Sequence, residues 1–513
     1  MSAVNIVFRT DASAQMGTGH LMRCLTLASE LRERGAASLF VCRHLPSSMA
    51  TQLEQQGHQL RRLTSLAQPI AEDCPLAHAD WLGTSWCADA EEARDAIAGL
   101  AFVPDWLVVD HYALDARWER ALRPSAKRIL VIDDLGDRMH DCDCLLDQNM
   151  HSMPAARYQG KVGQPCRLLL GPRYALLRPE FAAARIKSQG RDGAPRRVLV
   201  FMGGIDAANA TQTVVRGVLA LSAENLELEI VTTDANPNLA ALHVEFGVLP
   251  NVGITVDAHD MAQRIAAADI AIGAGGGAML ERACLGLPTL TISIAENQEA
   301  GAESLGLIGA TLYLGRSIDV DAGSVRDAMS VLLMSATLRS SLAERAAALV
   351  DGKGAERVSR FLHGGTLALR PAVAADAGSV LTWRNDERTR RYSGDGTVIA
   401  SDDHARWFAA MLADDSRKML IAEEEGIATG VLRYDIEGQV AAVSIFLVPG
   451  NQGRGLGDRI LAAGEEWLSR ACPAVRELEA VVREDNVASL SVFEATGFER
   501  NSVLLRKKVT VNV

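Results

Sequence analysis

The chain has 513 residues, of which 48% are hydrophobic and 23% charged, a composition typical of a folded globular protein. A single hydrophobic core rarely extends over such a length, so we expect two or three domains. The 52 basic and 64 acidic residues give a formal net charge of −12. This charge argues against a protein that binds nucleic acid or an anionic membrane, because either partner needs a basic surface. A small anionic ligand is still compatible, since backbone amides can hold phosphate.

The first residues, MSAVNIVFRT, carry no basic leader, and no apolar run approaches the roughly 20 residues of a membrane-spanning helix. Nine scattered cysteines suit reduced thiols. We therefore expect a cytoplasmic protein. One cluster, HDCDC at 140–144, lacks the second pair of ligands that a zinc site needs. We interpret Cys142 and Cys144 as buried small side chains on one strand face, and we expect no metal.

Short apolar runs alternate with helical patterns over the first two-thirds of the chain. Strands are expected at 4–10, 38–43, 105–112 and 128–134, and in a second series at 196–204, 226–233, 252–257, 268–276 and 288–294. Continuous apolar strands separated by helices indicate parallel sheets covered on both faces. We predict an α/β protein with two Rossmann-like domains, residues 1–175 and 190–362, facing a cleft.

A third domain of mixed α/β type is predicted over residues 366–513. FLHGG at 361–365 has the features of a helix end and a short linker. Residues 418–450 predict antiparallel strands with tight turns, and a long helix is expected at 455–471.

The segment RTDASAQMGTGHLMRCLTLASELRERG, residues 9–35, joins the first strand to an amphipathic helix. The apolar residues of this helix follow helical spacing, at Leu21, Cys24, Leu25, Ala28 and Leu31. Gly35 is expected to end the helix. Gly17 and Gly19 let a ligand approach the backbone where free amides attract an anion. His20 at this point suits general acid or base catalysis, although a histidine that merely caps a tight turn gives the same pattern.

The second domain contains a similar loop in AIGAGGGAMLERACLGLPTL, residues 271–290. Three glycines end a strand, and Glu281 lies one turn into the following helix. Glycine amides and a carboxylate together suit the diphosphate and ribose of a nucleotide. The alternative is that Glu281 is an ordinary surface residue of the helix. The turn VFMGGID, residues 200–206, offers Gly203 and Gly204 to the same cleft.

Six segments in this order resemble the UDP-sugar hydrolase family of pseudaminic acid biosynthesis, over residues 1 to about 360. They are RTDASAQMGTGHLMRCLTLA, VVDHYALDARWE, VIDDLGDRMHDCDCLLDQN, GPRYALLRPEF, GAGGGAMLERACLGLP and AENQ. That family has a GT-B-like architecture related to the peptidoglycan N-acetylglucosaminyl transferase. The resemblance implies metal-independent hydrolysis of UDP-2,4-diacetamido-2,4,6-trideoxy-β-L-altropyranose to UDP and free sugar.

The same resemblance implies roles for individual residues. The catalytic residues would be His20, Tyr112 and Asn297, and the UDP-binding residues would be Gly17, Gly19, Gly203, Gly204, Gly276, Gly277, Glu281 and Gln298. Members often carry Ser or Thr where this chain has Gly277-Ala278, which leaves the amides but no hydroxyl for a phosphate contact. Asp11 is the reserve base. His111 is a weaker candidate, because a residue at its position more often orients a loop.

A second glycine loop lies in FLVPGNQGRGLGDRILAAGEEWL, residues 446–468, and is followed by ELEAVVREDNVASLSVFEATGFE, residues 477–499. Such a loop presents free amides to a pyrophosphate, although a glycine-rich turn alone can be structural. Together the two segments resemble the GNAT superfamily of N-acetyltransferases over residues 366–509. The resemblance implies acetyl-CoA as co-substrate, held by Leu447, Gln452, Gly453, Arg454, Gly455, Gly457, Asn486 and Ser489.

Further features bear on this acetyltransferase. WRND at 383–386 and HARWF at 404–408 are similar to the branch that acts on amino sugars and on ribosomal-protein termini. The family implies splayed strands around 444–447, where the thioester lies. Phe493 stands where many relatives have a tyrosine that protonates the thiolate. His404 and Glu423 are candidate bases, with ordinary surface residues as the favoured interpretation.

The two resemblances together imply a bifunctional enzyme that N-acetylates a UDP-4-amino-sugar and hydrolyses the resulting UDP-diacetamido-sugar. Acetyl-CoA would be its co-substrate, with no metal, no nucleic acid and no membrane as partner. The alternatives are a GT-B glycosyltransferase that uses a UDP-sugar, a non-catalytic UDP-sugar sensor, and a C-terminal domain that acetylates protein N-termini.

Overall fold

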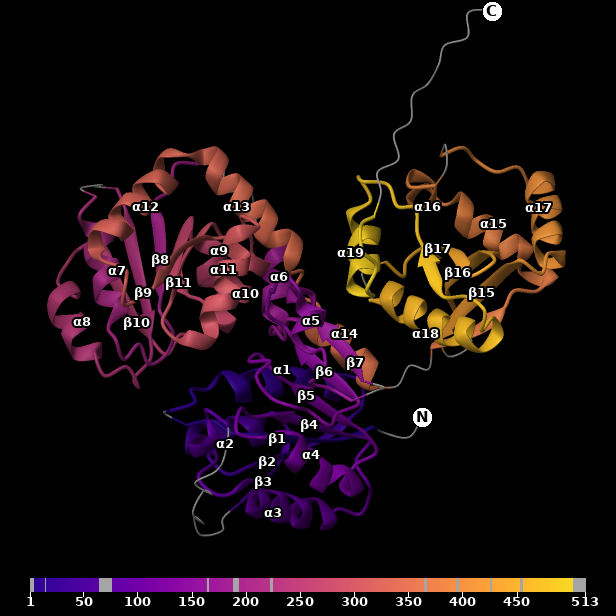
Figure 1. Ribbon diagram of the computed structural model, residues 1–513. Coiled ribbons are helices and arrows are strands. Elements are labelled where there is room, and N and C mark those ends of the chain that lie inside the picture. The colour runs from indigo at the N-terminus through magenta and orange to yellow at the C-terminus, as the bar shows by residue number, and fades with distance from the viewer. Residues whose placement is uncertain are drawn as a thin grey trace, which may run out of the picture. The chain divides into compact units, whose positions relative to one another are not determined.

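The computed structural model describes residues 4–13, 15–63, 76–163, 166–187, 193–221, 225–363, 367–393, 396–424, 427–452 and 455–501. The chain divides into two compact units, Met1–His363 and Gly364–Val513 (Figure 1). The first unit contains two parallel sheets and the second contains one mixed sheet. No helix in these described ranges is long and apolar enough to cross a membrane.

The first sheet has seven parallel strands in the order β3-β2-β1-β4-β5-β6-β7. The strands are β1 (Asn5–Thr10), β2 (Ala37–Cys42), β3 (Gln59–Arg62), β4 (Trp106–Asp110), β5 (Ile129–Ile132), β6 (Cys144–Asp147) and β7 (Arg167–Leu170). The helices between them are α1 (Gly19–Glu33), α2 (Ser47–Gln55), α3 (Trp86–Ala98), α4 (Ala116–Leu122) and α5 (Pro154–Arg157), with short 3-10 turns η1 (Ala79–Leu82), η2 (Arg123–Ser125) and η3 (Pro172–Tyr174). This is the Rossmann order with one added strand.

The second sheet has six parallel strands in the order β10-β9-β8-β11-β12-β13, the same winding without the added strand. The strands are β8 (Arg197–Phe201), β9 (Glu227–Thr232), β10 (Val252–Val256), β11 (Ile270–Ala274), β12 (Thr289–Ser293) and β13 (Leu312–Arg316). The helices of this part are α6 (Pro179–Lys187), α7 (Ala210–Leu219), α8 (Leu239–Phe246), α9 (Met261–Ala267), α10 (Gly277–Cys284), α11 (Glu299–Leu307), α12 (Ala322–Met334) and α13 (Ala336–Leu349), with the 3-10 turn η4 (Glu296–Gln298) before α11.

The predicted pair of Rossmann-like sheets is confirmed, and every strand expected in the two series exists. Four further strands, β3, β6, β7 and β13, have no counterpart among the expected strands. All are four or five residues long. β3, β7 and β13 lie at a sheet edge, and β6 lies next to the edge strand β7. Edge strands bury fewer side chains, so β3, with the sequence QLRR, lacks the apolar run that marks a buried strand.

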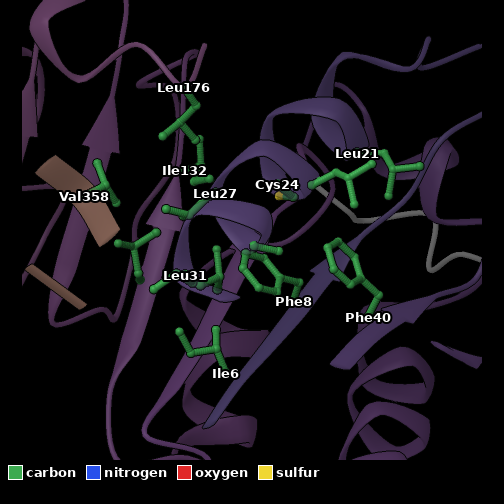
Figure 2. Close-up of a cluster of buried hydrophobic side chains, with 14 of the residues drawn as sticks. Ile6, Phe8, Leu21, Cys24, Leu27, Leu31, Phe40, Ile132, Leu176 and Val358 are labelled. Atoms are coloured by element: carbon green, nitrogen blue, oxygen red, sulfur yellow. The ribbon is translucent and has the colours of Figure 1, made fainter. Parts of the chain in front are cut away.

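The last helix of the first unit, α14 (Gly354–Leu362), packs on the first sheet, although its residues fall in the range predicted for the second domain. Val358 and Leu362 are buried in one cluster with Phe8 and Leu31, and Figure 2 shows Val358 at the edge of this cluster. Trp106 Nε1 on β4 donates to the Leu362 carbonyl at 2.9 Å. The chain therefore returns to the first sheet before it enters the second unit.

The second unit is built on a five-stranded sheet in the order β14-β15-β16-β17-β18, antiparallel except for the parallel pair β17–β18. The strands are β14 (Leu367–Pro371), β15 (Arg417–Glu424), β16 (Ile427–Glu437), β17 (Val440–Leu447) and β18 (Glu477–Glu479), and the helices are α15 (Ala377–Asn385), α16 (Glu387–Arg391), α17 (Ser401–Ala413), α18 (Leu456–Ala471) and α19 (Val487–Ala495), with the 3-10 turn η5 (Ala374–Asp376). Two separate clusters cover the two faces, one with α15 and α17 and the other with α18 and α19. The predicted antiparallel strands and mixed α/β fold are confirmed.

Candidate functional site

In each parallel sheet the central pair of strands carries the candidate site. β1 pairs with β4, and β8 pairs with β11, and at these pairs the strand order reverses direction. Connections from such neighbours leave to opposite faces, which opens a crevice at the carboxyl edge where ligands bind. The loop before α1 and the residues after β4 therefore meet at the carboxyl edge of the first sheet. The two glycine turns meet at the carboxyl edge of the second sheet.

His20 is the second residue of α1 and is held by Asp110 at the end of β4. Its Nδ1 lies 2.6 Å from Asp110 Oδ1, and the residue is only 6% exposed. Asp110 is fully buried and also accepts from Arg23 Nε at 2.6 Å and Arg23 Nη2 at 2.7 Å. Burial alone would raise the pKa of Asp110, but the charges of Arg23 and His20 outweigh burial and hold that pKa well below its usual range.

This arrangement fixes which imidazole nitrogen carries the hydrogen. Because Asp110 is a carboxylate and can only accept, the contact at 2.6 Å requires Nδ1–H to donate. Within the described part of the chain, Nε2 of His20 makes no hydrogen bond. In its uncharged form such a ring offers a lone pair at Nε2, which is the geometry of a general base oriented by a carboxylate. Asp110 and Arg23 were not among the predicted site residues, although Arg23 lies one helical turn after His20.

Tyr112 contacts residues from the parts of the chain that form both parallel sheets. Its ring meets His20 edge-on, with centroids 4.4 Å apart. Its hydroxyl donates to Asp134 Oδ2 at 3.1 Å and lies 3.5 Å from Asn297 Nδ2 in the loop after β12. Asp134 in turn accepts from Arg23 at 2.7 Å. Burial, then the charge of Asp134, raises the pKa of Tyr112 well above its usual range, so its phenol stays protonated and is no base.

Asp11 and His111, the other candidate bases, have structural roles. Asp11 is fully buried, and its carboxylate binds Arg9 Nη1 at 2.8 Å and accepts from the amide of Arg43 at 2.7 Å. His111 is 1% exposed and its Nδ1 accepts from the Ala113 amide at 3.0 Å. Its Nε2 points to Asp11 at 3.4 Å. Both side chains therefore hold loops that follow strands of the first sheet.

The glycine turns of the second sheet lie side by side, as predicted, because β8 and β11 are paired. Gly204 is in contact with Thr233 after β9, whose hydroxyl donates to the Gly204 carbonyl at 2.6 Å. Gly276 is the N-cap of α10, which begins at Gly277, and a side chain at Gly277 would meet no atom within 4 Å. There is therefore open space beside the first residue of α10. Gln298 borders Gly276 and accepts from the Ile294 amide at 3.2 Å, which fixes this loop.

A buried cation lies beneath this glycine loop. Arg282 is 2% exposed and donates from Nη2 to the Ala274 carbonyl at 2.7 Å. Its Nε and Nη1 have no hydrogen-bond partner among the described residues. Burial, partly offset by Glu281, lowers the pKa of Arg282 to about 10, which leaves it charged at neutral pH. A guanidinium so poorly neutralised raises the positive potential where an anion would bind. Sequence patterns gave no signal for this residue beyond its place next to Glu281.

Glu281 lies one turn into α10, as predicted, and is 20% exposed. Its Oε1 is 3.8 Å from Arg178 Nη2. Burial, partly offset by the charge of Arg178, raises the pKa of Glu281 to about 7. The carboxylate is thus half-buried, and its contact with a ribose stays a prediction. Gly17 and Gly19 lie before His20, where Gly17 donates to the Ser13 carbonyl at 2.8 Å and a side chain at either glycine would meet no atom within 4 Å.

In the second unit, the strand pair β17–β18 opens as the resemblance implied. Pairing of β17 with β18 is limited to 440–442 with 477–479, so within the described residues β17 continues to Leu447 with β16 as its one paired neighbour. A cavity of about 450 Å³ adjoins this end and is lined by Thr382, Trp383, Asn385, Asp386, Val448 and Pro449. The free edge of β17 offers backbone groups to an extended ligand, and the cavity next to it has room for an acceptor.

The predicted acetyl-CoA residues that the structure describes cap helices, pack between them or fix a turn. Gly455, the N-cap of α18, has a left-handed backbone with φ +66°. Gly457 packs against Val492 of α19. Asn486 caps α19 by accepting from the Ser489 amide at 3.2 Å. Gln452 accepts from the amide of Gly450 at 2.9 Å. Gly453 and Arg454 lie outside the described residues.

The two candidate bases of this unit, His404 and Glu423, and Phe493 at the position of the family's tyrosine have different surroundings. His404 is 3% exposed and packs against Trp407 and Phe408, so the surface interpretation is wrong for it. Glu423 accepts from Arg370 Nε at 2.8 Å and is committed to that ion pair. Phe493 is 7% exposed and packs edge-on against Phe498 in the core.

The HDCDC segment is buried, but its two cysteines do not share a strand face. Cys144 begins β6 and packs in one cluster of the first sheet, whereas Cys142 precedes β6 and packs in the other, 3.6 Å from Cys166 Sγ. His140 is 2% exposed and lies between Glu119, at 2.7 Å, and Asp133, at 3.7 Å. Burial opposes its charge, but these two carboxylates raise the pKa of His140 to about 9. No group of three or more metal-ligating side chains occurs among the described residues.

Two parallel Rossmann sheets with facing switch-point sites define the first unit as GT-B-like, and the splayed mixed sheet with its glycine-entered helix is typical of an acetyltransferase. Residues 366–499 match the family described as "Acetyltransferase (GNAT) domain". The chain carries a GNAT domain in its second unit.

The first unit is homologous to enzymes of sugar-nucleotide metabolism. A UDP-2,4-diacetamido-2,4,6-trideoxy-β-L-altropyranose hydrolase of Campylobacter jejuni is 24% identical over 302 residues, 58% of this chain and 95% of that protein. The spore coat polysaccharide biosynthesis protein SpsG of Bacillus subtilis is 32% identical over 198 residues, and the match spans 58% of its length and 38% of this chain. The crystal structure of MurG of Acinetobacter baumannii, at 15% identity, superposes with a TM-score of 0.50 over 70% of this chain and 99% of its own, which establishes the shared fold.

Gly273 tests the packing beneath the glycine loop. A methyl group at Gly273 would lie 2.5 Å from Arg282 Nη1 and 2.9 Å from the Phe201 carbonyl. We expect Gly273→Ala to lower the free energy of unfolding by about 1–3 kcal/mol, the usual effect of overpacking. Gly277→Ala is the matched control and is expected to unfold like the wild type, since its side chain meets open space. Equal denaturant midpoints for both variants would contradict this packing.

His140 makes stability depend on pH in a stated direction. Its folded pKa of about 9 exceeds the ordinary value of 6.5. The charged ring therefore stabilises the fold fully below pH 6.5, and this contribution is lost as the pH rises through 9. We expect the difference in unfolding free energy between wild type and His140→Gln to shrink by about 1.4 kcal/mol per pH unit in that window. A difference that stays constant with pH would mean that His140 is neutral.

Proposed function

We propose that the chain is a bifunctional, cytoplasmic enzyme of pseudaminic acid biosynthesis. The first unit hydrolyses UDP-2,4-diacetamido-2,4,6-trideoxy-β-L-altropyranose to UDP and free sugar. The second unit acetylates the UDP-4-amino-sugar precursor with acetyl-CoA. The observation that carries the hydrolase is His20, held through Nδ1 by Asp110, with Nε2 unpaired in the described chain beside Tyr112 and Asn297.

In the proposed hydrolysis, the oxygen of water attacks C1 and the bond from C1 to the UDP oxygen breaks. Nε2 of His20 takes the proton of the water, and UDP leaves with the bonding electrons. The amides at the start of α10, with Arg282 beneath them, stabilise the charge of the departing diphosphate. Glu281 holds the ribose hydroxyls. No step requires a metal ion, because His20 activates the water and the amides stabilise the leaving group.

In the proposed acetylation, the C4 amine attacks the thioester carbonyl of acetyl-CoA directly, the thiolate of CoA departs, and the amine loses a proton. Two cations on the α15–α17 side of the sheet favour an anionic acceptor. The Arg384 guanidinium lies 5.7 Å over the Phe446 ring, and that of Arg433 lies 5.8 Å over the Trp407 ring. Burial, then the charge of Arg433, lowers the pKa of Arg384. Arg433 is paired with Asp435 at 2.9 Å, whereas Arg384 has no carboxylate partner among the described residues. A UDP-linked sugar brings a negative charge that suits Arg384, whereas a protein N-terminus brings a positive one.

One assay tests both activities. Purified chain is incubated with acetyl-CoA and UDP-4-amino-4,6-dideoxy-N-acetyl-β-L-altrosamine in water enriched in oxygen-18, and free CoA and UDP are measured. We expect CoA first and UDP second, with the label in the sugar, because attack at C1 leaves the UDP oxygens unchanged. Transfer of the sugar to an added acceptor, without free sugar, would favour a glycosyltransferase. Acetylation of peptides alone would favour the protein N-terminal alternative.

His20→Asn tests the base. The amide keeps polarity and approximate size but offers no basic nitrogen, so we expect unchanged UDP affinity and turnover lower by about 10²–10⁴-fold. The matched control is His243→Asn, at an exposed position on α8, which is expected to keep the wild-type rate. UDP release and calorimetric binding of UDP are the two measurements. Turnover of His20→Asn at the wild-type rate would end the assignment.

Gly455→Val separates the two activities. A β-branched residue strongly disfavours the left-handed φ of +66° at this position, so the loop before α18 must move. We expect CoA affinity to fall by about tenfold or more, while hydrolysis of the already acetylated UDP-sugar is unchanged. Gly438→Val, at a turn with φ +61°, introduces the same strain elsewhere in the sheet and is the control. An equal loss of CoA binding in both variants would assign the effect to strain alone.

A further inference from the structure

A group of aromatic rings lies next to the candidate base His20 in the part of the chain that forms the first sheet. His78 and Trp81, at and just inside η1, form this group with Tyr112. The His78 ring lies 4.3 Å from that of Trp81 and 5.4 Å from that of Tyr112, and the Trp81 ring lies 5.7 Å from that of Tyr112. Tyr112 itself contacts His20. Neither His78 nor Trp81 was among the predicted site residues.

The polar atoms of these two rings are uncommitted. Trp106 and Trp118 are buried and donate their indole N–H groups to Leu362 and Asp89, each at 2.9 Å. Trp81, which is only partly buried, makes no such bond to any residue that the structure describes, and neither does His78. Burial lowers the pKa of His78, and the nearby charge of Asp137 opposes this shift only in part. Amphipathic rings with free polar atoms next to a catalytic group are suited to bind a ligand.

The position of these rings relative to UDP indicates which part of the substrate they would contact. In the proposed function, the glycine turns and Glu281 of the second sheet hold UDP, and C1 lies near His20 and Asn297. The hexose then extends from C1 toward the first sheet, where His78 and Trp81 flank Tyr112. Flat rings suit the C–H face of a pyranose, and a sugar with a C6 methyl group and acetamido substituents presents more apolar surface than a fully hydroxylated one.

We propose that His78 and Trp81 form the hexose subsite, with Trp81 stacked on the sugar ring and the two side chains setting the preference for a 6-deoxy, acetamido-bearing hexose. This inference rests on the proposed hydrolase function. The role is substrate binding and positioning: proton transfer remains with His20. Because UDP itself carries no hexose, the two side chains contribute to affinity for the UDP-sugar and not to affinity for UDP.

The test compares Trp81→Ala and Trp81→Phe with wild type, using the UDP-diacetamido-sugar as substrate and UDP as a separate ligand. We expect Trp81→Ala to raise KM by about tenfold to a hundredfold, with less change in kcat and an unchanged Kd for UDP. Trp81→Phe keeps a flat ring and is expected to recover most of this loss, even if the alanine variant is poorly folded. Trp86→Ala is the control, since Trp86 lies under Arg117, apart from the ring group.

The outcomes separate this inference from the function on which it rests. If wild type releases no UDP from the UDP-sugar, the hydrolase function fails and the hexose subsite fails with it. If wild type is active and Trp81→Ala keeps the wild-type KM, the hydrolase stands and the subsite is overturned. A loss of UDP affinity equal to the loss of UDP-sugar affinity, or a similar rise in KM for Trp86→Ala, would also overturn it, because either result indicates a general structural effect.

Discussion

The buried carboxylate of Asp110 is the group on which the first unit's site depends. A carboxylate with no contact with water is unstable unless cations and hydrogen bonds compensate it, and here Arg23 supplies both. Arg23 also binds Asp134, and Asp134 accepts from Tyr112. The imidazole of His20 is thus one end of a connected set of ion pairs and hydrogen bonds that reaches Asn297, in the loop after β12 of the second sheet. Its orientation follows from this set more than from the helix that carries it.

The two parallel sheets share one winding but contribute different chemistry. The first supplies side chains at its switch point, including the candidate base His20, the phenol of Tyr112 and the rings of His78 and Trp81. The second supplies backbone amides at α10, with the guanidinium of Arg282 beneath them. An enzyme that cleaves a sugar nucleotide needs both, since one part of the substrate must react and the other must be held. α14 ties the end of the second sheet's chain to the core of the first.

Backbone amides also explain how an acidic chain can hold anions. The formal net charge of −12 does not favour long-range attraction of a diphosphate. α10 begins at Gly277, and α18 begins at Leu456 directly after its N-cap Gly455; free amides at such a start bind phosphate groups without surface lysines. In the GNAT domain the same principle is combined with the free edge of β17, where the parallel partner strand ends after three residues.

The sequence by itself determined the local features whose causes lie within a few residues. Apolar runs marked the central strands, the helical spacing of Leu21 to Leu31 marked α1, and the glycine turns marked the ends of β8 and β11. It did not identify Asp110, Arg23, Arg282 or Trp81 as site residues. It predicted that Cys142 and Cys144 are buried, but not that they pack in different hydrophobic clusters. Those properties depend on which strands become neighbours and which side chains then lose contact with water. Only the tertiary structure decides them, because burial, charge pairing and ring contacts join residues that are far apart along the chain.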